Sequence, residues 1–191
     1  SGAENLNYVL YTDESPYKMQ REWLDRLPFD IYSVNVHTGA KRLIGRSYRT
    51  APKWSVNGKW AVMYDPIAQV WNKFDGATGK VVNISDAIGY PMFMESYDKP
   101  APAPAYGIAG WTADGNNVFL YDAYDWWKID LTGERQPECL TKGYGRKHGK
   151  SIRKMTSNID KDVFQKDEKV IVSLWDKDTM DEGVYQLDMK G

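Results

Sequence analysis

Residues 54–85 read WSVNGKWAVMYDPIAQVWNKFDGATGKVVNIS, and residues 111–141 read WTADGNNVFLYDAYDWWKIDLTGERQPECLT. The two stretches are copies of one pattern. Trp54 and Trp111 lie 57 positions apart (111 − 54), and the Tyr-Asp pairs at 64–65 and 121–122 keep the same offset. A Thr-Gly pair follows in both copies. A repeat of this size, filled with short strand-like segments, indicates a fold built from similar consecutive units.

Each copy resolves into four short strands separated by turns. The predicted strands cover 52–55, 60–65, 70–75 and 80–84 in the first copy, and 108–111, 118–122, 126–130 and 136–140 in the second. Asn57-Gly58 and Asp114-Gly115 occupy the same slot, and both are strong hairpin signals. Four strands per unit are typical of a β-propeller blade.

The flanks of the repeat look like incomplete copies. Strands are predicted at 7–12, 30–35 and 41–44 before the repeat, and at 151–155, 169–175 and 183–188 after it. The first group lacks an inner strand and the last lacks an outer one. The sequence therefore predicts an all-β fold, a single β-propeller fragment over 1–191: a partial blade at 1–45, whole blades at 51–85 and 107–141, and a partial blade at 151–191. Because a closed ring needs at least four blades, we expect an open arc, or else an unusually small closure.

Three insertions interrupt the pattern. Residues 16–28 are expected to form a helical turn or an extended loop. Residues 86–106 carry Pro100, Pro102 and Pro104, which favours an extended, polyproline-like segment. Residues 142–150, KGYGRKHGK, are expected to be a basic, glycine-rich loop.

Composition excludes several classes of protein. The formal net charge of −1 argues against a nucleic-acid partner, which requires a basic face or tail. No apolar run approaches the roughly 20 residues of a membrane span. The single cysteine, Cys139, permits no internal disulfide. Neither a cofactor nor a metal is predicted. Aromatic residues make up 14% of the chain, which suits packed sheets and also sugar or peptide recognition.

Longer blocks resemble a known family. The blocks from WSVNGKW to TGK and from WTADGNN to TGE resemble the blades of TolB-like propellers. More specifically, the chain resembles the N-terminal propeller of bacterial prolyl oligopeptidase and dipeptidyl peptidase IV-like serine peptidases, common in Bacteroides-type bacteria. The blocks that carry this resemblance are REWLDRLPFDIYSVNVHTGAKRLI, YGIAGWTADGNNVFLYDAYDWWKIDLTGE, LTKGYGRKHG and VIVSLWDKDTMDEGVYQLD.

The resemblance implies a role for the chain. In that family the propeller caps an α/β-hydrolase domain and filters peptides on their way to a Ser-Asp-His triad. The implied partners are the hydrolase domain and the peptide substrate, and the implied location is the periplasm, the cell surface or the outside of the cell.

The catalytic signature of the family is missing. A nucleophile elbow reads Gly-x-Ser-x-Gly after a strand. Residues 45–49 and 149–153 both lack the closing glycine and lie in segments that connect blades. We therefore expect this chain to lack the hydrolase domain and to have no peptidase activity of its own.

Three residues are the candidates for substrate contact. Tyr144 and Arg146 lie in the loop after the second full blade, where the resemblance implies that side chains reach the central cavity and hold peptide carbonyls or carboxylates. Trp126 and Trp127 are adjacent on a strand, so their rings face opposite sides. One of the two must point away from the main layer between blades or toward the neighbouring blade, and Trp126 is the candidate for exposure.

Other polar residues are interpreted as structural. Neither His37 nor His148 has the neighbours of a zinc site. The acidic group of Asp176, Asp178, Asp181 and Glu182 lacks the glycine and the distal glutamate of an EF-hand, and is interpreted as a charged hairpin tip. The recurring Asp65, Asp75, Asp122 and Asp130 are expected to cap turns through hydrogen bonds to the backbone.

Three functional hypotheses follow. The first is a non-catalytic propeller segment of a serine peptidase that gates peptide access and packs on the hydrolase domain. The alternative is a stand-alone TolB-like propeller module for protein–protein binding. The third is a sugar-binding aromatic platform, suggested by the tryptophan content. The open strand edges of the partial blades also predict self-association or marginal stability.

Overall fold

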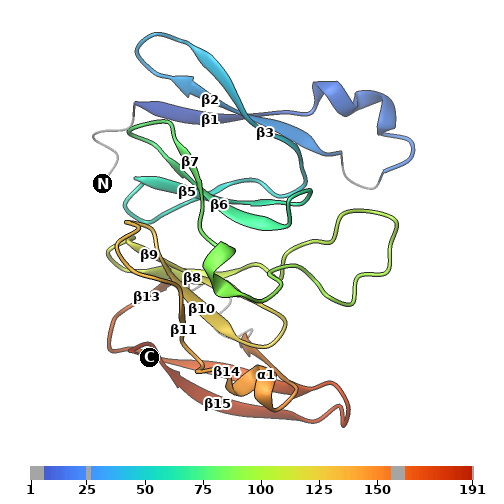
Figure 1. Cartoon of the computed structure of the whole chain (residues 1–191), viewed down its shortest axis with the longest axis vertical. Helices are drawn as coiled ribbons and strands as arrows, with labels where there is room; N and C mark the ends of the chain where they lie inside the picture. Colours follow the sequence, from blue (N-terminus) through green and yellow to red (C-terminus); the bar gives the residue numbers. More distant parts are fainter. Residues whose placement is uncertain (1–6, 25–26, 156–161, 191) are drawn as a thin grey trace. The chain divides into compact units, whose positions relative to one another are not determined.

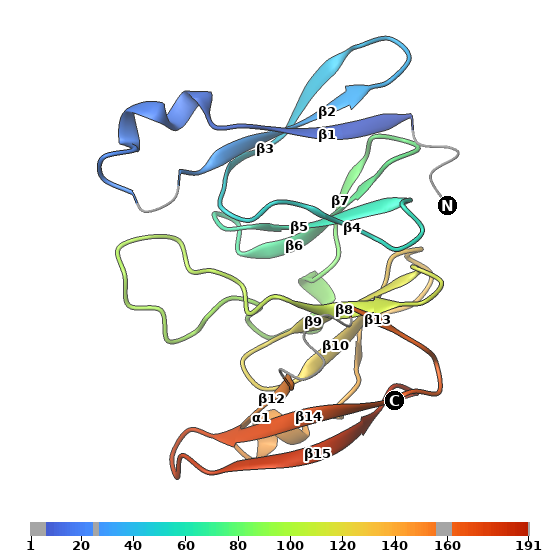
Figure 2. The same ribbon diagram turned by 180° about the vertical axis from the view of Figure 1, so that it is seen from behind.

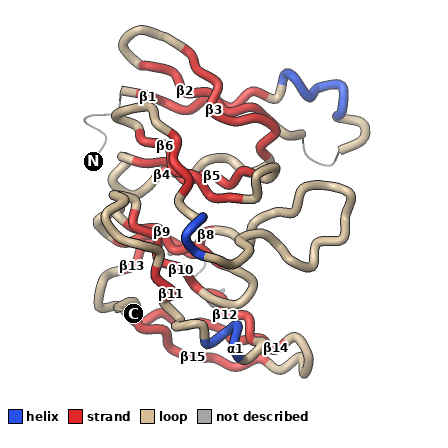
Figure 3. Tube along the Cα trace, viewed as in Figure 1, coloured by secondary structure: helices blue, strands red, loops and turns tan. Residues whose placement is uncertain are grey.

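The computed structural model describes residues 7–24, 27–155 and 162–190. The chain forms two compact units, residues 1–84 and 85–191, so the boundary falls at the end of the first full repeat. Strands and connecting loops dominate both units, and the helical segments are short (Figure 3).

The first unit contains two antiparallel sheets (Figure 1). The first sheet, in the order β1-β2-β3, comprises β1 (Tyr8–Asp13), β2 (Phe29–Asn35) and β3 (Lys41–Tyr48). The second sheet, in the order β4-β5-β6-β7, comprises β4 (Lys53–Trp54), β5 (Trp60–Asp65), β6 (Val70–Asp75) and β7 (Val81–Asn83). The buried core of this unit consists of Phe29, Ile31, Tyr48, Ala61, Met63 and Phe74. These core residues come from both sheets, as expected for neighbouring blades.

The second unit contains the other two sheets. The third sheet comprises β8 (Ile108–Thr112), β9 (Asn117–Tyr121), β10 (Trp126–Asp130), β11 (Glu138–Cys139) and β13 (Val163–Phe164). The fourth sheet, in the order β12-β14-β15, comprises β12 (Lys150–Lys154), β14 (Lys169–Asp176) and β15 (Glu182–Asp188). Its core includes Phe119, Tyr121, Trp126, Ile152, Phe164, Val172 and Leu174. These side chains fill the space between the third and fourth sheets.

The sheets confirm the predicted fold class. The chain is all-β, with two complete units of the propeller-blade type, one of four strands and one of five, flanked by two three-stranded, partial units. Every strand of the repeat lies within two residues of its predicted place.

Strand β13 was missed by the sequence analysis. It pairs in parallel with β8 and adds a fifth strand to the third sheet (Figure 2). The amide of Trp111 donates to the carbonyl of Asp162 at 2.8 Å, and that of Ala113 to the carbonyl of Phe164 at 3.0 Å. The ring of Phe164 lies against Gly110, where a Cβ atom would collide with it. A two-residue strand gives no periodic signal, so only its long-range partner reveals it.

The first insertion contains the helical turn that was one of its two expected outcomes, and the other two have more local structure than expected. The first begins with a 3-10 helix, η1 (Ser15–Gln20); part of its remainder lies outside the described residues. The second begins with another, η2 (Asp86–Ile88), and then folds back through a bridge between Phe93 and Ala105. The expectation of a simply extended segment is therefore wrong there, because backbone pairing bends the chain. The third contains one helical turn, α1 (Tyr144–Lys147).

The recurring aspartates cap turns, as predicted. Oδ1 of Asp65 accepts hydrogen bonds from the amides of Ile67 (2.9 Å) and Ala68 (3.0 Å). Oδ1 of Asp122 does the same for Tyr124 and Asp125, at 2.7 and 2.6 Å. Asp75 and Asp130 cap the later Thr-Gly turns in the same way. Such side-chain acceptors satisfy amides that would otherwise lack partners in the turn.

Candidate functional site

The loop after β11 is held by one buried carboxylate. Asp125, in the turn between β9 and β10, is 2% exposed. Its Oδ1 accepts hydrogen bonds from the Thr141 hydroxyl at 2.6 Å and the Gly145 amide at 2.9 Å, and its Oδ2 accepts one from the Arg146 amide at 2.9 Å. These three hydrogen bonds offset the free-energy cost of removing the carboxylate from water. Asp125 thereby fixes α1, and with it Tyr144 and Arg146, on the sheet.

Gly145 is required by the close approach of the chain to this carboxylate. A Cβ atom at this position would lie 2.7 Å from the carbonyl oxygens of Lys150 and Tyr124 and 2.9 Å from Oδ1 of Asp125. No larger residue fits without moving backbone atoms.

The side chain of Arg146 joins two insertions. Its Nη2 lies 3.1 Å from Oε1 of Glu95 and 3.3 Å from Oδ2 of Asp122. The guanidinium also lies over the rings of Tyr90 (4.4 Å) and Tyr124 (5.0 Å), within cation–π range. Since Tyr90 and Glu95 belong to residues 86–106, Arg146 connects that insertion to the 142–150 loop.

The charges around Arg146 stabilise its protonated form. Burial by itself would lower the pKa of Arg146, but the hydrogen bond to Glu95 and the charge of Asp122 outweigh it and raise the pKa above its ordinary value. The Nε atom is buried and has no hydrogen-bond partner within the described part of the chain. The Arg146 side chain remains 25% exposed and that of Glu95 37%, so both are accessible to a ligand.

Asp122 is the buried centre of the cluster. It is fully buried, and its Oδ2 also accepts a hydrogen bond from Nε1 of Trp127 at 3.1 Å. Nη2 of Arg153 donates to the backbone carbonyl of Asp122 at 2.7 Å. Burial lowers the pKa of Arg153, while the charges of Tyr121 and Asp122 oppose that effect. Asp122 therefore has two structural roles: it caps its own turn, and it forms an ion pair with Arg146.

The expectation that Trp126 or its neighbour is exposed is wrong. Trp126 is fully buried, its ring packs edge-on against Tyr121, and its Nε1 donates to the carbonyl of Ile152 at 3.1 Å. Trp127 is only 8% exposed, because it bonds Asp122 and lies against Tyr90. The two rings do face opposite sides of the third sheet, but both sides are covered.

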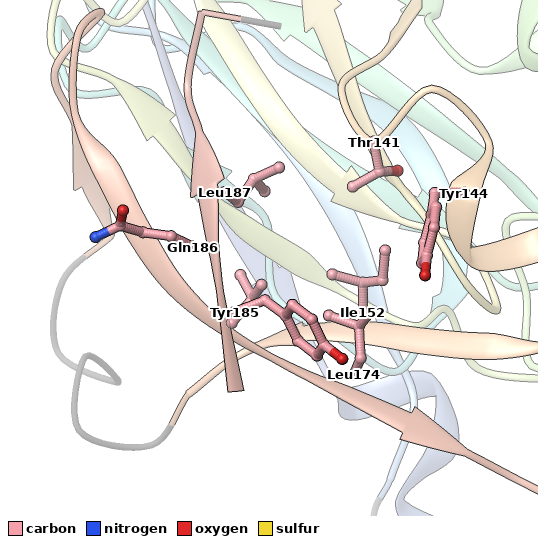
Figure 4. Close-up of a pocket in the computed structure, with 8 residues that line it drawn as sticks. Thr141, Tyr144, Ile152, Leu174, Tyr185, Gln186 and Leu187 are labelled. Carbon is pink, nitrogen blue, oxygen red and sulfur yellow. The ribbon is translucent and has the colours of Figure 1, made fainter. Parts of the chain in front are cut away.

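Tyr144 lies in different surroundings from Arg146. It is 46% exposed, stacks on His148 with ring centroids 4.4 Å apart, and borders a groove of about 340 Å³ (Figure 4). The groove is lined by Thr141, Tyr144, Ile152, Val172, Leu174, Tyr185, Gln186 and Leu187. The structure thus places Tyr144 and Arg146 on the same helical turn, with Trp126 in the core of the same unit. Contact of these three residues with a substrate stays a prediction.

Sequence patterns did not predict that Asp125, Glu95, Tyr90 and Arg153 belong to the site. One signal for Asp125 was present, because the first copy of the repeat has Ala68 at the equivalent position. A buried carboxylate in only one copy indicates a task specific to that copy. Glu95 and Tyr90 gave no signal, since their partner lies some fifty residues away in the chain.

His37 and the acidic hairpin tip, to which the sequence assigned structural roles, contact polar side chains of this chain. Nε2 of His37 lies 3.3 Å from Oδ1 of Asn7. Asp176 caps its hairpin and pairs with Lys150 at 3.3 Å, which supports the structural interpretation of the acidic tip. Within residues 7–24, 27–155 and 162–190, no cluster of three or more His, Cys, Asp or Glu side chains is arranged to hold a metal ion. Ser47 and Ser151 lie within strands β3 and β12.

The repeat tryptophans do not form an exposed platform. Trp71, Trp111, Trp126 and Trp127 are all buried. Trp54 and Trp60, the other repeat tryptophans, are half-buried. Outside the repeats, Trp23 and Trp175 are 83% and 37% exposed, so the sugar-binding hypothesis stays a prediction. No helix in the described ranges combines the length and the apolar character that crossing a bilayer requires.

The structure and its site define a segment made of β-propeller-type blades. No protein-family model and no curated protein matches the chain. Among solved structures, it is similar to the putative TolB from Agrobacterium tumefaciens, at 15% identity and a TM-score of 0.39, covering 95% of this chain and 62% of that one. TolB from Acinetobacter baumannii is similar at 12% identity and a TM-score of 0.27, covering 96% of this chain and 52% of that one. The chain thus spans less than two thirds of either structure, and likeness this low carries no argument about activity.

Proposed function

We propose that this chain is a non-catalytic propeller segment of a serine peptidase of the prolyl oligopeptidase family, where it gates peptide access and packs on an α/β-hydrolase domain. One observation supports this proposal above the others. The most distinctive family-like blocks, at 106–112 and 121–127, lie in the same part of the fold as the Asp125–Arg146 cluster. The second block supplies Asp122, Asp125 and Trp127, and the block at 140–149 supplies Arg146. The residues that carry the resemblance are therefore those that position a charged, accessible loop.

The chemistry of this loop suits peptide recognition. The guanidinium of Arg146 is held by Asp122 and Glu95 and backed by aromatic rings, so it is oriented before a ligand arrives. Carbonyl and carboxylate oxygens of a peptide are acceptors for such a group. Tyr144, on the same helical turn, offers a hydroxyl and an exposed ring.

The gene provides the first test. A region encoding an α/β-hydrolase domain after Gly191 supports the proposal. A stop codon there refutes it and leaves the stand-alone TolB-like binding module. A fluorophosphonate probe should label the longer protein and leave residues 1–191 unlabelled; labelling of the isolated segment would show that it has a reactive serine of its own.

Kinetics of the longer protein test the role of Arg146. Replacing Arg146 by Gln should raise KM for peptides and leave kcat nearly unchanged, because a contact made equally in the ground and transition states affects binding alone. Arg135→Gln is the matched control, since Arg135 is an exposed arginine in the connection between β10 and β11 of the same unit. Equal effects of the two variants would contradict a specific role for Arg146.

Location and self-association complete the proposal. A periplasmic, surface or secreted location rests on the family resemblance alone. Self-association through open strand edges is supported by β1, an edge strand of the first sheet whose Val9 and Tyr11 are 45% and 48% exposed.

A further inference from the structure

The groove beside Tyr144 lies within the second unit and has an apolar floor. Its volume of about 340 Å³ is at the lower end of the range of small-molecule sites, roughly 300–1,000 Å³. The buried side chains of Ile152, Val172 and Leu174 form the floor. The rings of Tyr144 and Tyr185, which are 46% and 53% exposed, also line the groove (Figure 4).

The third sheet carries an indole ring at the corresponding place. In this sheet Leu120 is the direct cross-strand partner of Ile108 on one side and of Trp127 on the other. Direct partners have their side chains next to each other on one face of a sheet. The ring of Trp127 also lies against Tyr90 of the 86–106 connection, with ring centroids 6.0 Å apart, and Trp127 is only 8% exposed. The indole is therefore packed between a leucine of the sheet and a tyrosine of the preceding connection.

The fourth sheet repeats this arrangement without the indole. Leu174 is the direct partner of Ile152 on one side and of Gly183 on the other. In both sheets the leucine belongs to the second pair of the ladder, counted from the turn that joins the two strands. Tyr144 again comes from the connection that precedes the sheet. Gly183 thus stands where Trp127 stands in the third sheet.

Two differences within the second unit keep the groove open. The first is the absent side chain at Gly183, whose place is taken only in part by the ring of Tyr185: a Cβ atom at 183 would lie 2.6 Å from Cε2 of that ring. The second is the connection that precedes each sheet. Residues 86–106 bury two large apolar side chains, whereas residues 142–150 bury none. The fourth sheet therefore lacks apolar groups that cover the corresponding part of the third.

We propose that this groove binds a small molecule that carries an aromatic ring of about the size of indole. The bound ring lies on Ile152 and Leu174 and packs against the rings of Tyr144 and Tyr185, as the indole of the third sheet packs on its leucine and tyrosine. Burial of the apolar ring supplies the affinity, and contacts between aromatic rings add to it. Because Arg146 does not line the groove, the proposal does not depend on the peptidase function.

Calorimetric titration of the whole chain with indole tests the proposal. We expect saturable binding of one indole per chain. Gly183→Trp supplies the ring from the chain itself and should weaken binding at least about tenfold, because the new side chain covers the apolar surface that the ligand buries. The ring of Tyr185 is half-exposed and can move aside for it. Val184→Trp is the matched control, since neighbouring strand residues point to opposite faces, and it should change the affinity less than about twofold.

A variant at the rim tests the aromatic contact independently of Gly183→Trp. Tyr144→Leu keeps an apolar side chain at an exposed position and removes the ring, so the affinity for indole should fall about two- to tenfold, as the loss of an aromatic pair predicts. Lys147→Leu, on the same helical turn but outside the groove, should leave the affinity unchanged. Thermal unfolding of each variant shows that the sheets are intact.

Four results would overturn the proposal. They are the absence of saturable indole binding to the unmodified chain, binding that persists in folded Gly183→Trp, equal weakening by Gly183→Trp and Val184→Trp, and an unchanged affinity in Tyr144→Leu.

Discussion

The carboxylate of Asp125 lies 2.9 Å from the backbone nitrogen of Arg146, twenty-one residues away in the sequence. This contact places the only helical turn of the 142–150 loop against the β9–β10 turn. The side chain of Arg146 then meets Asp122 and Glu95 at 3.3 and 3.1 Å. A buried structural carboxylate thus positions an accessible charged group.

Removing the Asp125 carboxylate should destabilise the second unit. Asp125→Ala leaves the Thr141 hydroxyl and two backbone amides without their acceptor, and buried unsatisfied donors cost about 1–3 kcal/mol each. We expect the free energy of unfolding, measured with urea, to fall by about 3 kcal/mol or more. Asp178→Ala, at an exposed hairpin tip, is the control and should change it by less than about 0.5 kcal/mol. Similar losses in both variants would contradict the anchoring role.

Replacing Arg146 should release the 86–106 insertion. Arg146→Gln removes the bond to Glu95 and the cation that lies over Tyr90. Limited proteolysis should then cut within residues 86–106 several-fold faster, whereas Arg146→Lys, which keeps the charge, should give an intermediate rate. Lys147→Gln, on the same helical turn, is the matched control. Unchanged cleavage in Arg146→Gln would show that other contacts hold the insertion.

Alkaline pH should unfold the first unit. Burial and the charge of Asp65 raise the pKa of Tyr48 and of Tyr64 to about 12, above the ordinary tyrosine value of about 10. Below pH 10 both tyrosines are neutral in the folded and unfolded states, so neither destabilises the fold. Between about pH 10 and 12 the unfolded chain loses its protons first, and stability falls by roughly 1.4 kcal/mol per pH unit for each tyrosine. Circular dichroism and tyrosinate absorbance should change together over this range.

Tyr48→Phe provides the control for the alkaline transition. It removes one of the two ionisable groups and should shift the unfolding midpoint to higher pH. It also removes the long contact of 3.4 Å between the Tyr48 hydroxyl and Asp65. A midpoint that stays in place would show that other groups drive the transition.

A methyl group at Gly145 should disturb the loop more than one at Gly149. The added Cβ at 145 would meet three oxygen atoms within 2.9 Å, whereas at 149 it would meet nothing within 4 Å and only the positive φ of 66° opposes it. Gly149→Ala should cost about 1–2 kcal/mol for the left-handed backbone. Gly145→Ala should cost more, because backbone atoms must move. Urea unfolding of the two variants checks this order, and the reverse order would contradict the steric argument.

The isolated segment should self-associate. Open strand edges with exposed apolar residues, such as β1 with Val9 and Tyr11, promote pairing between copies. Sedimentation velocity should show an average mass that rises with concentration, and Val9→Lys should reduce it. A monomer at high concentration with a sharp, high-temperature unfolding transition would refute the prediction.

The amino-acid sequence alone determined the blades. The repeat at 54–85 and 111–141 located the strands, because alternation and turn chemistry act over a few residues, and the recurring aspartates gave the turn caps for the same reason. The tertiary structure decided the site. The burial of Trp126 and Trp127, the pairing of β13 with β8 and the bonds of Arg146 to Glu95 and Asp122 join residues distant in the sequence. Such contacts depend on which faces of a sheet are covered by other elements, and the sequence pattern of a single strand or turn does not show which faces are covered.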